Sequence, residues 1–154
     1  MGSIRRTVFL LNRLLRDNVA AVSNRVYPDG IRVDSQLPRI VIKAITPNQQ
    51  FAALGSGVPN WKLVNFKVEI YGRNPQDCDR VAEQVEDAVA NNPNYRQTNT
   101  LIQDYLGTNQ TVASNGYFIL LKLNGGSETA LIPAYNMYKR DMLVGGKWLQ
   151  TATG

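Results

Sequence analysis

Apolar residues recur at helical spacing in two stretches of the chain. In residues 3–22 they stand three or four positions apart, which predicts an amphipathic first helix with its arginines largely on other faces. The stripe consists of Ile4, Val8, Leu11, Leu15, Val19 and Val22. A second stripe begins after Asn74-Pro75, which is typical of a helix cap with proline at the first helical position. It contains Val81, Val85, Ala88 and Val89 and ends at Asn91-Asn92-Pro93, so we predict a second helix there.

Four other stretches have the pattern of strands. Residues 39–45 form a short β-branched run after Pro38, and residues 61–71 alternate between apolar and polar side chains. The alternation predicts a core face of Val64, Phe66, Val68 and Ile70, and a face toward water or a partner of Asn65, Lys67, Glu69 and Tyr71. Residues 117–123 predict another strand, which turns at Gly125-Gly126-Ser127 and returns through residues 129–143 with an interruption near Pro133.

Three segments lack either period. Residues 46–60 combine prolines and glycines with scattered apolar side chains, which predicts a long flexible loop. Residues 94–115 are polar, and we expect a connecting segment with one short helical turn. Residues 146–154 form a C-terminal tail, in which Trp148 is a large apolar side chain for a frayed end. We therefore expect Trp148 to dock on a neighbouring molecule.

The order of these elements is helix, strand, strand, helix, strand, strand. It predicts a single α+β domain over residues 1–154, with a mainly antiparallel sheet and two helices packed on one face. A chain of this length buries a core without metal ions or disulfides. Its one cysteine, Cys78, has no partner within the chain, which favours a reducing compartment.

The residues of common catalytic sites are missing. The chain contains no histidine, which excludes Ser-His-Asp and Cys-His catalysis and the common histidine-containing zinc sites. Asp77 and Asp79 flank Cys78, and their charges raise the pKa of its thiol and make it a poor nucleophile. Neither Gly55-Ser56-Gly57 nor Gly145-Gly146-Lys147 has the context of a phosphate-binding loop. We therefore expect no enzymatic activity, no metal and no cofactor.

Positive charge is concentrated in the first third of the chain. Residues 1–43 hold eight of the 17 basic residues and three of the 12 acidic ones, so the remaining nine and nine balance. Such an excess attracts phosphate backbones or acidic partner surfaces, although solvated arginines on a helix face are the commoner explanation. The acids Glu83, Glu86 and Asp87 cluster on the second helix, where we expect them to face solvent. No apolar stretch approaches the roughly 20 residues that cross a bilayer, so we expect no membrane partner.

Four motifs follow one another in an order that resembles a known family. They are Arg25-Val26-Tyr27-Pro28, then Leu37-Pro38-Arg39-Ile40-Val41-Ile42, then Val64-Asn65-Phe66-Lys67-Val68-Glu69-Ile70-Tyr71-Gly72, then Asp79-Arg80-Val81-Ala82. With the first helix, this order and spacing resembles the tail terminator, or tail completion, proteins of long-tailed bacteriophages. The resemblance covers about residues 5–90, and the part after residue 94 departs from the family pattern.

The resemblance implies a structural virion protein that caps the tail tube at its final length and forms a ring joining tail to head. Its implied partners are its own copies in a hexameric ring, the tail tube protein and a neck or head-completion protein, with DNA passing through the ring without specific binding. It implies a place at the head–tail junction of the virion, after assembly in the host cytoplasm. Rings use heterologous contacts between different patches, which long loops and tails commonly supply.

We therefore expect subunit or tail-tube contacts from five apolar side chains, namely Phe51, Leu54, Val58, Trp61 and Trp148. The arginines Arg5, Arg6, Arg13 and Arg16 have two open interpretations, as the lining of a DNA channel or as contacts to an acidic partner. Two alternative functions also stay open. One is a neck or head-completion protein of the head–tail connector, and the other is a basic nucleic-acid-binding domain.

Overall fold

The computed structural model describes residues 3–28, 36–45, 50–51, 61–96, 99–103, 109–113 and 116–150. Within these ranges, the side chains of residues 3–6, 50, 51, 61, 62, 99–103, 109–113 and 150 lie outside the description. The helical elements are α1 (Ser3–Asn18), η1 (Ala20–Val22), α2 (Pro75–Asn91) and η2 (Pro133–Tyr135). The strands are β1 (Val26–Pro28), β2 (Arg39–Ala44), β3 (Gln50–Phe51), β4 (Trp61–Gly72), β5 (Asn99–Gln103), β6 (Asn109–Ala113), β7 (Gly116–Gly126), β8 (Ala130–Ile132) and β9 (Met137–Gln150).

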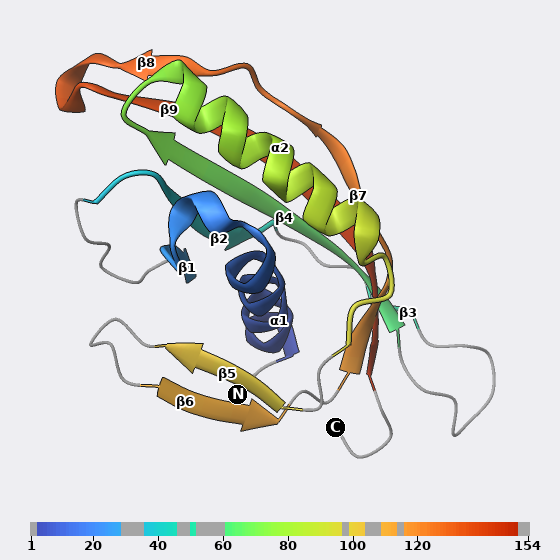
Figure 1. Cartoon of the computed structure of the whole chain (residues 1–154). Coiled ribbons are helices and arrows are strands. Elements are labelled where there is room, and N and C mark those ends of the chain that lie inside the picture. Colours follow the sequence, from blue (N-terminus) through green and yellow to red (C-terminus); the bar gives the residue numbers. More distant parts are fainter. Residues whose placement is uncertain are drawn as a thin grey trace.

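A seven-stranded sheet forms the centre of the fold, which confirms the predicted α+β class (Figure 1). Its order is β1-β2-β4-β9-β7, with β3 paired to β4 and β8 paired to β9. The pair β1–β2 is parallel and the other pairs of this sheet are antiparallel. The long strands β4 and β9 form the centre of the sheet, because each is paired with another strand on both sides.

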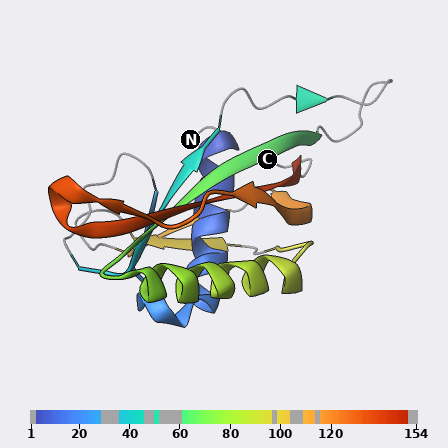
Figure 2. The same ribbon diagram turned by 90° about the horizontal axis from the view of Figure 1, so that it is seen from above.

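Helices α1 and α2 pack on one face of this sheet, as predicted. Helix α2 contacts β4, β7 and β9, while α1 contacts β1, β2 and α2. The predicted core positions of β4 and the predicted stripe of α2 are all buried in one cluster with β2 and α1. Figure 2 shows α2 on one side of the strands β4 and β9. This arrangement leaves the opposite side of the sheet without a covering helix in the described part of the chain.

Helix α1 is buried over more of its circumference than the predicted stripe. Phe9, Leu10 and Leu14 are buried in addition to the stripe residues from Val8 onward. Buried Asn12 donates from Nδ2 to the carbonyl of Val26 at 2.9 Å, which satisfies a polar group inside the packing. Because α1 also contacts β5, it lies between the main sheet and the β5–β6 pair (Figure 1). Neither described helix is both long and apolar enough to cross a membrane.

Helix α2 begins where the sequence predicts. The side chain of Asn74 accepts a hydrogen bond from the backbone N–H of Asp77 at 2.8 Å, and Pro75 occupies the first turn. Asp77 is in that first turn, where its charge complements the helix dipole. The helix ends at Asn91, and the N–H of Asn92 bonds to the carbonyl of Val89. The local capping signals thus fixed both ends correctly.

The prediction for residues 94–115 was wrong. Instead of a helical turn, the segment contains the antiparallel pair β5–β6, in which Leu101 faces Thr111 across the two strands. The physical reason is that β-branched residues such as Thr100, Ile102 and Val112 favour extended backbone. Strand β5 also contacts α1, and the polar sequence of the segment gives no sign of this contact.

The predicted turn at Gly125-Gly126-Ser127 was also wrong. Strand β7 runs through Gly126, and the chain continues in β8, which pairs with the same neighbour β9. The chain reverses instead at η2, where Pro133 starts a short 3-10 turn and Asn136 adopts a left-handed conformation (φ 49°). Asparagine tolerates that conformation better than most residues. The result is a projecting β8–η2–β9 arm at the end of the sheet (Figure 1).

The predicted C-terminal tail is strand as far as Gln150, because β9 pairs with β4 up to Leu149. Trp148 is only 1% exposed, so the expectation that it extends from a frayed end to a neighbour was wrong. Its ring packs edge-to-face on Phe118 with centroids 5.4 Å apart, and Phe118 packs on Phe66 at 5.9 Å. Gly116 makes room for the indole, since an added Cβ there would lie 2.5 Å from its ring. Most of the predicted loop over residues 46–60 lies outside the described residues.

Candidate functional site: the open face of the sheet

The side of the main sheet opposite the helices carries charged residues from distant parts of the chain. Strand alternation and the register assign to it the polar positions of β4 that the sequence predicts, together with their partners on β2, β9 and β7. We call this surface the open face. Its members include Arg39, Val41, Lys43, Leu63, Asn65, Lys67, Glu69, Tyr71, Ile119, Lys122, Lys139, Asp141, Leu143 and Lys147.

A buried carboxylate lies at the centre of the open face. Glu69 is 2% exposed, although the sequence assigns it to the wet side of β4. Its Oε2 lies 3.0 Å from Nζ of Lys139 and 3.6 Å from Nζ of Lys67, and its Oε1 lies 3.4 Å from Nζ of Lys43. Tyr71 donates its hydroxyl to Oε1 at 3.2 Å. Four side chains from β2, β4 and β9 thus converge on one carboxylate.

The electrostatics of this cluster keep Glu69 charged. Burial raises the pKa of Glu69, but the hydrogen bond and charge of Lys139 with the charge of Lys43 outweigh it and hold the pKa below its ordinary value. Burial likewise lowers the pKa of Lys139, and the hydrogen bond to Glu69 reverses this and raises it. The pKa of Tyr71 is raised by burial and then by the charge of Glu69. A buried charge of this kind is tolerable because it is paired on several sides.

Two further contacts extend the cluster along the sheet. Asp141 lies 3.6 Å from Lys67 and 3.6 Å from Lys139, so it bridges the same lysines beside Glu69. The guanidinium of Arg39 stacks over the ring of Tyr71 at 5.0 Å. These contacts add to the ring of polar side chains around Glu69, which is how its carboxylate is buried without a covering helix.

The open face is strongly basic overall. It carries six basic side chains, namely Arg39, Lys43, Lys67, Lys122, Lys139 and Lys147, against the carboxylates of Glu69 and Asp141. Only Arg39 and Lys43 belong to the first third of the chain, to which the sequence count assigns all the positive excess. The sheet register, rather than the position in sequence, therefore gathers this charge. Charged side chains gathered on one side of a sheet are suited to binding a partner of opposite charge.

The four arginines singled out from the sequence belong to α1, which packs on the side of the sheet opposite the open face. The side chains of Arg5 and Arg6 lie outside the described residues. Arg13 on α1 forms an ion pair with Asp17 at 2.7 Å. Arg16 is partly buried, and burial followed by the charge of Arg13 lowers the pKa of its guanidinium. Neither interpretation of these arginines, channel lining or acidic-partner contact, is tested by these positions.

The five apolar residues expected at contacts divide into two groups. Leu54 and Val58 lie outside the described residues, as do the side chains of Phe51 and Trp61, whose backbones pair with each other in the β3–β4 contact. Trp148 is buried in its own subunit, so it has no surface to offer a neighbour. Exposed apolar side chains that the sequence reasoning missed are Leu131 and Tyr135 on the projecting arm, which are 48% and 72% exposed.

The outer face of α2 has the opposite charge to the open face. Its exposed side chains include the acids Asp79, Glu83, Glu86 and Asp87 and a single basic residue, Arg80. Asp79 is engaged by Arg140 at 3.1 Å and by the hydroxyl of Thr129 at 3.1 Å. The sequence prediction that Glu83, Glu86 and Asp87 face solvent is confirmed. We call these exposed residues of α2 the outer face of the helix.

Neither a cluster of metal-ligating side chains nor an activated thiol is present in the described parts of the chain. They contain no group of three or more potential metal-ligating His, Cys, Asp or Glu side chains. Cys78 is fully buried, and burial followed by the charges of Asp79 and Asp77 raises its pKa to about 11. The sequence predicted from the flanking acids that the pKa of Cys78 is raised, and this direction is correct, although burial raises the pKa more than the acids do.

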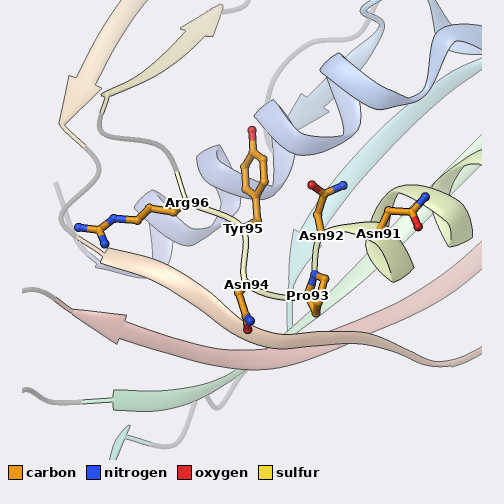
Figure 3. Close-up of a pocket in the computed structure, with 6 residues that line it drawn as sticks. All are labelled: Asn91, Asn92, Pro93, Asn94, Tyr95 and Arg96. Atoms are coloured by element: carbon orange, nitrogen blue, oxygen red, sulfur yellow. The ribbon is translucent and has the colours of Figure 1, made fainter.

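A shallow hollow of about 430 Å³ lies at the end of α2, where the residues that follow the helix run beside β7, and it is lined by Asn91, Asn92, Pro93, Asn94, Tyr95 and Arg96. Figure 3 shows that these side chains point in different directions. The backbone there joins the two elements, since Phe118 N–H bonds to the carbonyl of Tyr95 and Leu121 N–H to that of Pro93. The polar groups of a ligand site converge, and those of this hollow do not, so we interpret the hollow as part of the connection between the two elements.

Comparisons with known proteins reveal a likeness of fold. No protein-family model and no curated protein matches the chain. Among solved structures, a chain of the structure titled "Virion of native gene transfer agent (GTA) particle" is similar, with a TM-score of 0.56 and 12% sequence identity. The match covers 90% of this chain and 91% of that chain. The α+β fold described above is therefore similar, over nearly its whole length, to that of a chain in a gene transfer agent particle.

Proposed function

We propose that this chain is a structural subunit of a phage-like virion, of the tail-terminator type, which caps the tail tube at its final length and joins tail to head. The observation that carries the proposal is the fold likeness, over 90% of the chain, to a chain of a gene transfer agent particle. A fold alone does not determine a function, so the proposal also uses the ordered motifs of the sequence.

Those motifs fall on successive elements of the fold. Val26-Tyr27-Pro28 is β1, Arg39-Ile40-Val41-Ile42 opens β2, and the third motif forms most of β4. The fourth motif lies in α2, which packs on β4. The resemblance to tail terminators thus follows one contiguous half of the sheet and its helix. This agreement between motif order and packing supports the proposal beyond the fold likeness.

The surfaces of the subunit also favour assembly over catalysis. A basic open face, an acidic helix and an arm with exposed Leu131 and Tyr135 are three different surfaces available to partners. The proposed partners are further copies in a hexameric ring, the tail tube protein and a neck or head-completion protein, with DNA passing through the ring. We retain Phe51, Leu54, Val58 and Trp61 as proposed tail-tube or subunit contacts, while Trp148 is withdrawn because it is buried.

A nucleic-acid-binding domain is the second candidate, because six basic side chains gather on one flat surface. It predicts tight binding to free duplex that weakens steeply with salt, since neutralised phosphates release counterions. A titration at several salt concentrations measures this directly. Binding of that kind with the open face required would favour this candidate over the virion role.

The virion role is tested by deleting the gene from its parent particle and imaging the lysate by negative-stain microscopy. The proposal predicts overlong or unjoined tails beside DNA-filled heads. Tails of normal length beside leaking heads would instead favour the alternative of a neck or head-completion protein. Unchanged particles would contradict any virion role.

A further inference from the structure

The subunit has two oppositely charged surfaces on opposite sides of one layer. Helix α2 covers one side of β4, β7 and β9, and the open face is the other side of the same strands (Figure 2). On the helix, Glu83, Glu86 and Asp87 are exposed to solvent. On the sheet, Lys122 is exposed and Lys147 is partly exposed, away from the cluster around Glu69. A single subunit cannot bring these two surfaces together.

We propose that the open face of one copy binds the outer face of α2 on the next copy. The contact joins a surface with six basic and two acidic side chains to one with four acidic side chains and one basic. This inference deepens the proposed function, because it names the contact between ring subunits on which that function rests.

The dimensions of the two surfaces agree. From Glu83 to Asp87 the helix rises by about 6 Å, at roughly 1.5 Å per residue. On β9, Lys147 lies two residues beyond Gly145, the partner of Lys122, so the two lysine positions are separated by about 7 Å along the strands. A helix laid along the sheet therefore brings these two carboxylates opposite the two ammonium groups.

The composition of the open face favours a protein helix over nucleic acid. Glu69 and Asp141 stand among the lysines, so both signs of charge are interspersed on the surface, whereas a uniform positive charge suits a phosphate backbone. Apolar side chains also intervene, with Leu63 36% exposed and Val41 and Leu143 partly exposed. An interface core with apolar groups inside a charged rim is typical of protein contacts.

The contact has a definite symmetry. Because it joins two different patches, it is heterologous, and an open chain of copies keeps one unused patch of each kind, at its two ends, until the assembly closes. Patches on opposite sides of a subunit cannot both be satisfied in a two-fold dimer. The proposal therefore predicts closed rings or open chains as the associated state, and no stable symmetric dimer.

Charge reversal on each face tests the contact with purified full-length protein. The sheet variant carries Lys122→Glu and Lys147→Glu, which leave the lysines around Glu69 in place. The helix variant carries Glu83→Lys and Asp87→Lys, and a fourfold variant combines all these changes. A matched control, Asp17→Lys, alters an exposed charge on α1, an element that belongs to neither surface. Circular dichroism and thermal unfolding establish that each variant is folded.

Sedimentation velocity at about 50 mM and about 500 mM salt measures the association. We expect wild-type protein and the control to associate at low salt. The sheet variant and the helix variant should each associate with an affinity that is lower by about tenfold or more. The fourfold variant restores association because the carboxylates introduced on the sheet meet the ammonium groups introduced on the helix. Mixing the sheet and helix variants also restores it, since alternating copies are complementary.

Three outcomes would overturn the contact. The first is a wild-type chain that stays monomeric at low salt, and the second is folded single-face variants that associate like wild type. The third is duplex DNA binding that the sheet variant loses and the helix variant retains, without any self-association, which would assign the open face to nucleic acid. Failure here refutes the contact alone, because overlong tails in the deletion lysate would still support the terminator role.

Discussion

Val68 and Glu69 are neighbours on β4, and both are buried, but for different physical reasons. Val68 is 0% exposed because α1 and α2 cover its side of the sheet with apolar side chains. Glu69 is 2% exposed because lysines from β2, β4 and β9 lie over it on the open face. Burial on the first face excludes water from a close-packed core, whereas burial on the second is achieved by charged side chains that are themselves partly exposed to solvent. The two faces should therefore respond very differently to substitution.

The largest expected effect is on the helix-covered face. Trp148→Ala removes the indole that packs on Phe118 and leaves a large cavity, which should lower the free energy of unfolding by about 3–5 kcal/mol. Urea unfolding monitored by circular dichroism measures the change. A loss below about 1 kcal/mol would show that Trp148 is not part of the core.

On the open face, Glu69→Gln should cost less although the residue is equally buried. Lys43 and Lys67 can turn toward solvent when the carboxylate is lost, so we expect a decrease of about 1–2 kcal/mol at neutral pH. Asp141→Asn is the matched control, because it removes a more exposed carboxylate of the same cluster. If Glu69→Gln destabilised the protein as much as Trp148→Ala, the distinction between the two faces would fail.

The pH dependence gives a second test of the same cluster. The pKa of Glu69 in the folded protein is below its ordinary value of 4.5, so the unfolded chain binds the proton first as pH falls. Its contribution to stability is therefore full above that value and is lost as pH falls through the folded pKa. Wild type should lose more stability than Glu69→Gln on acidification below about pH 4.5. Asp77, whose pKa is also lowered by Arg73, is present in both proteins, so its effect on the difference in stability between them cancels. Parallel curves would contradict the charged state of Glu69.

The labelling rate of the Cys78 thiol tests how tightly the helix-covered face is packed in the wild-type protein. The thiol is buried and its pKa is raised to about 11, so a thiol reagent at pH 8 should react only when the protein opens. Labelling should be slow in native buffer and rapid in denaturant. Rapid labelling of the native protein would mean that α2 does not stay packed on the sheet.

The smallest effect is expected at the projecting arm. Tyr135 is 72% exposed, so Tyr135→Ser should change the free energy of unfolding by about 0.5 kcal/mol or less. Thermal unfolding measures this change, and a larger loss would indicate that the arm folds back onto the subunit.

Sequence patterns predicted the covered face far better than the open one. The ends of α2 follow from Asn74 and Asn91, and the buried positions of β4 follow from alternation, because these are local signals. The β5–β6 pair and the strand character of residues 146–150 depend on pairing with distant segments, which local polarity conceals. Glu69 was assigned to the correct face, but its burial depends on Lys43 and Lys139, which only the sheet register brings together. No local signal identifies such a cluster.

The most direct test of the central claim, that the open face is an assembly surface, is zero-length carbodiimide cross-linking of a mixture of 14N- and 15N-labelled protein. Lys139 and Glu69, 3.0 Å apart in one subunit, provide an internal control that yields same-isotope products. The account predicts mixed-isotope cross-links from Lys122 or Lys147 to Glu83, Glu86 or Asp87. Mixed-isotope products that avoid these residues, or none at all under associating conditions, would contradict it.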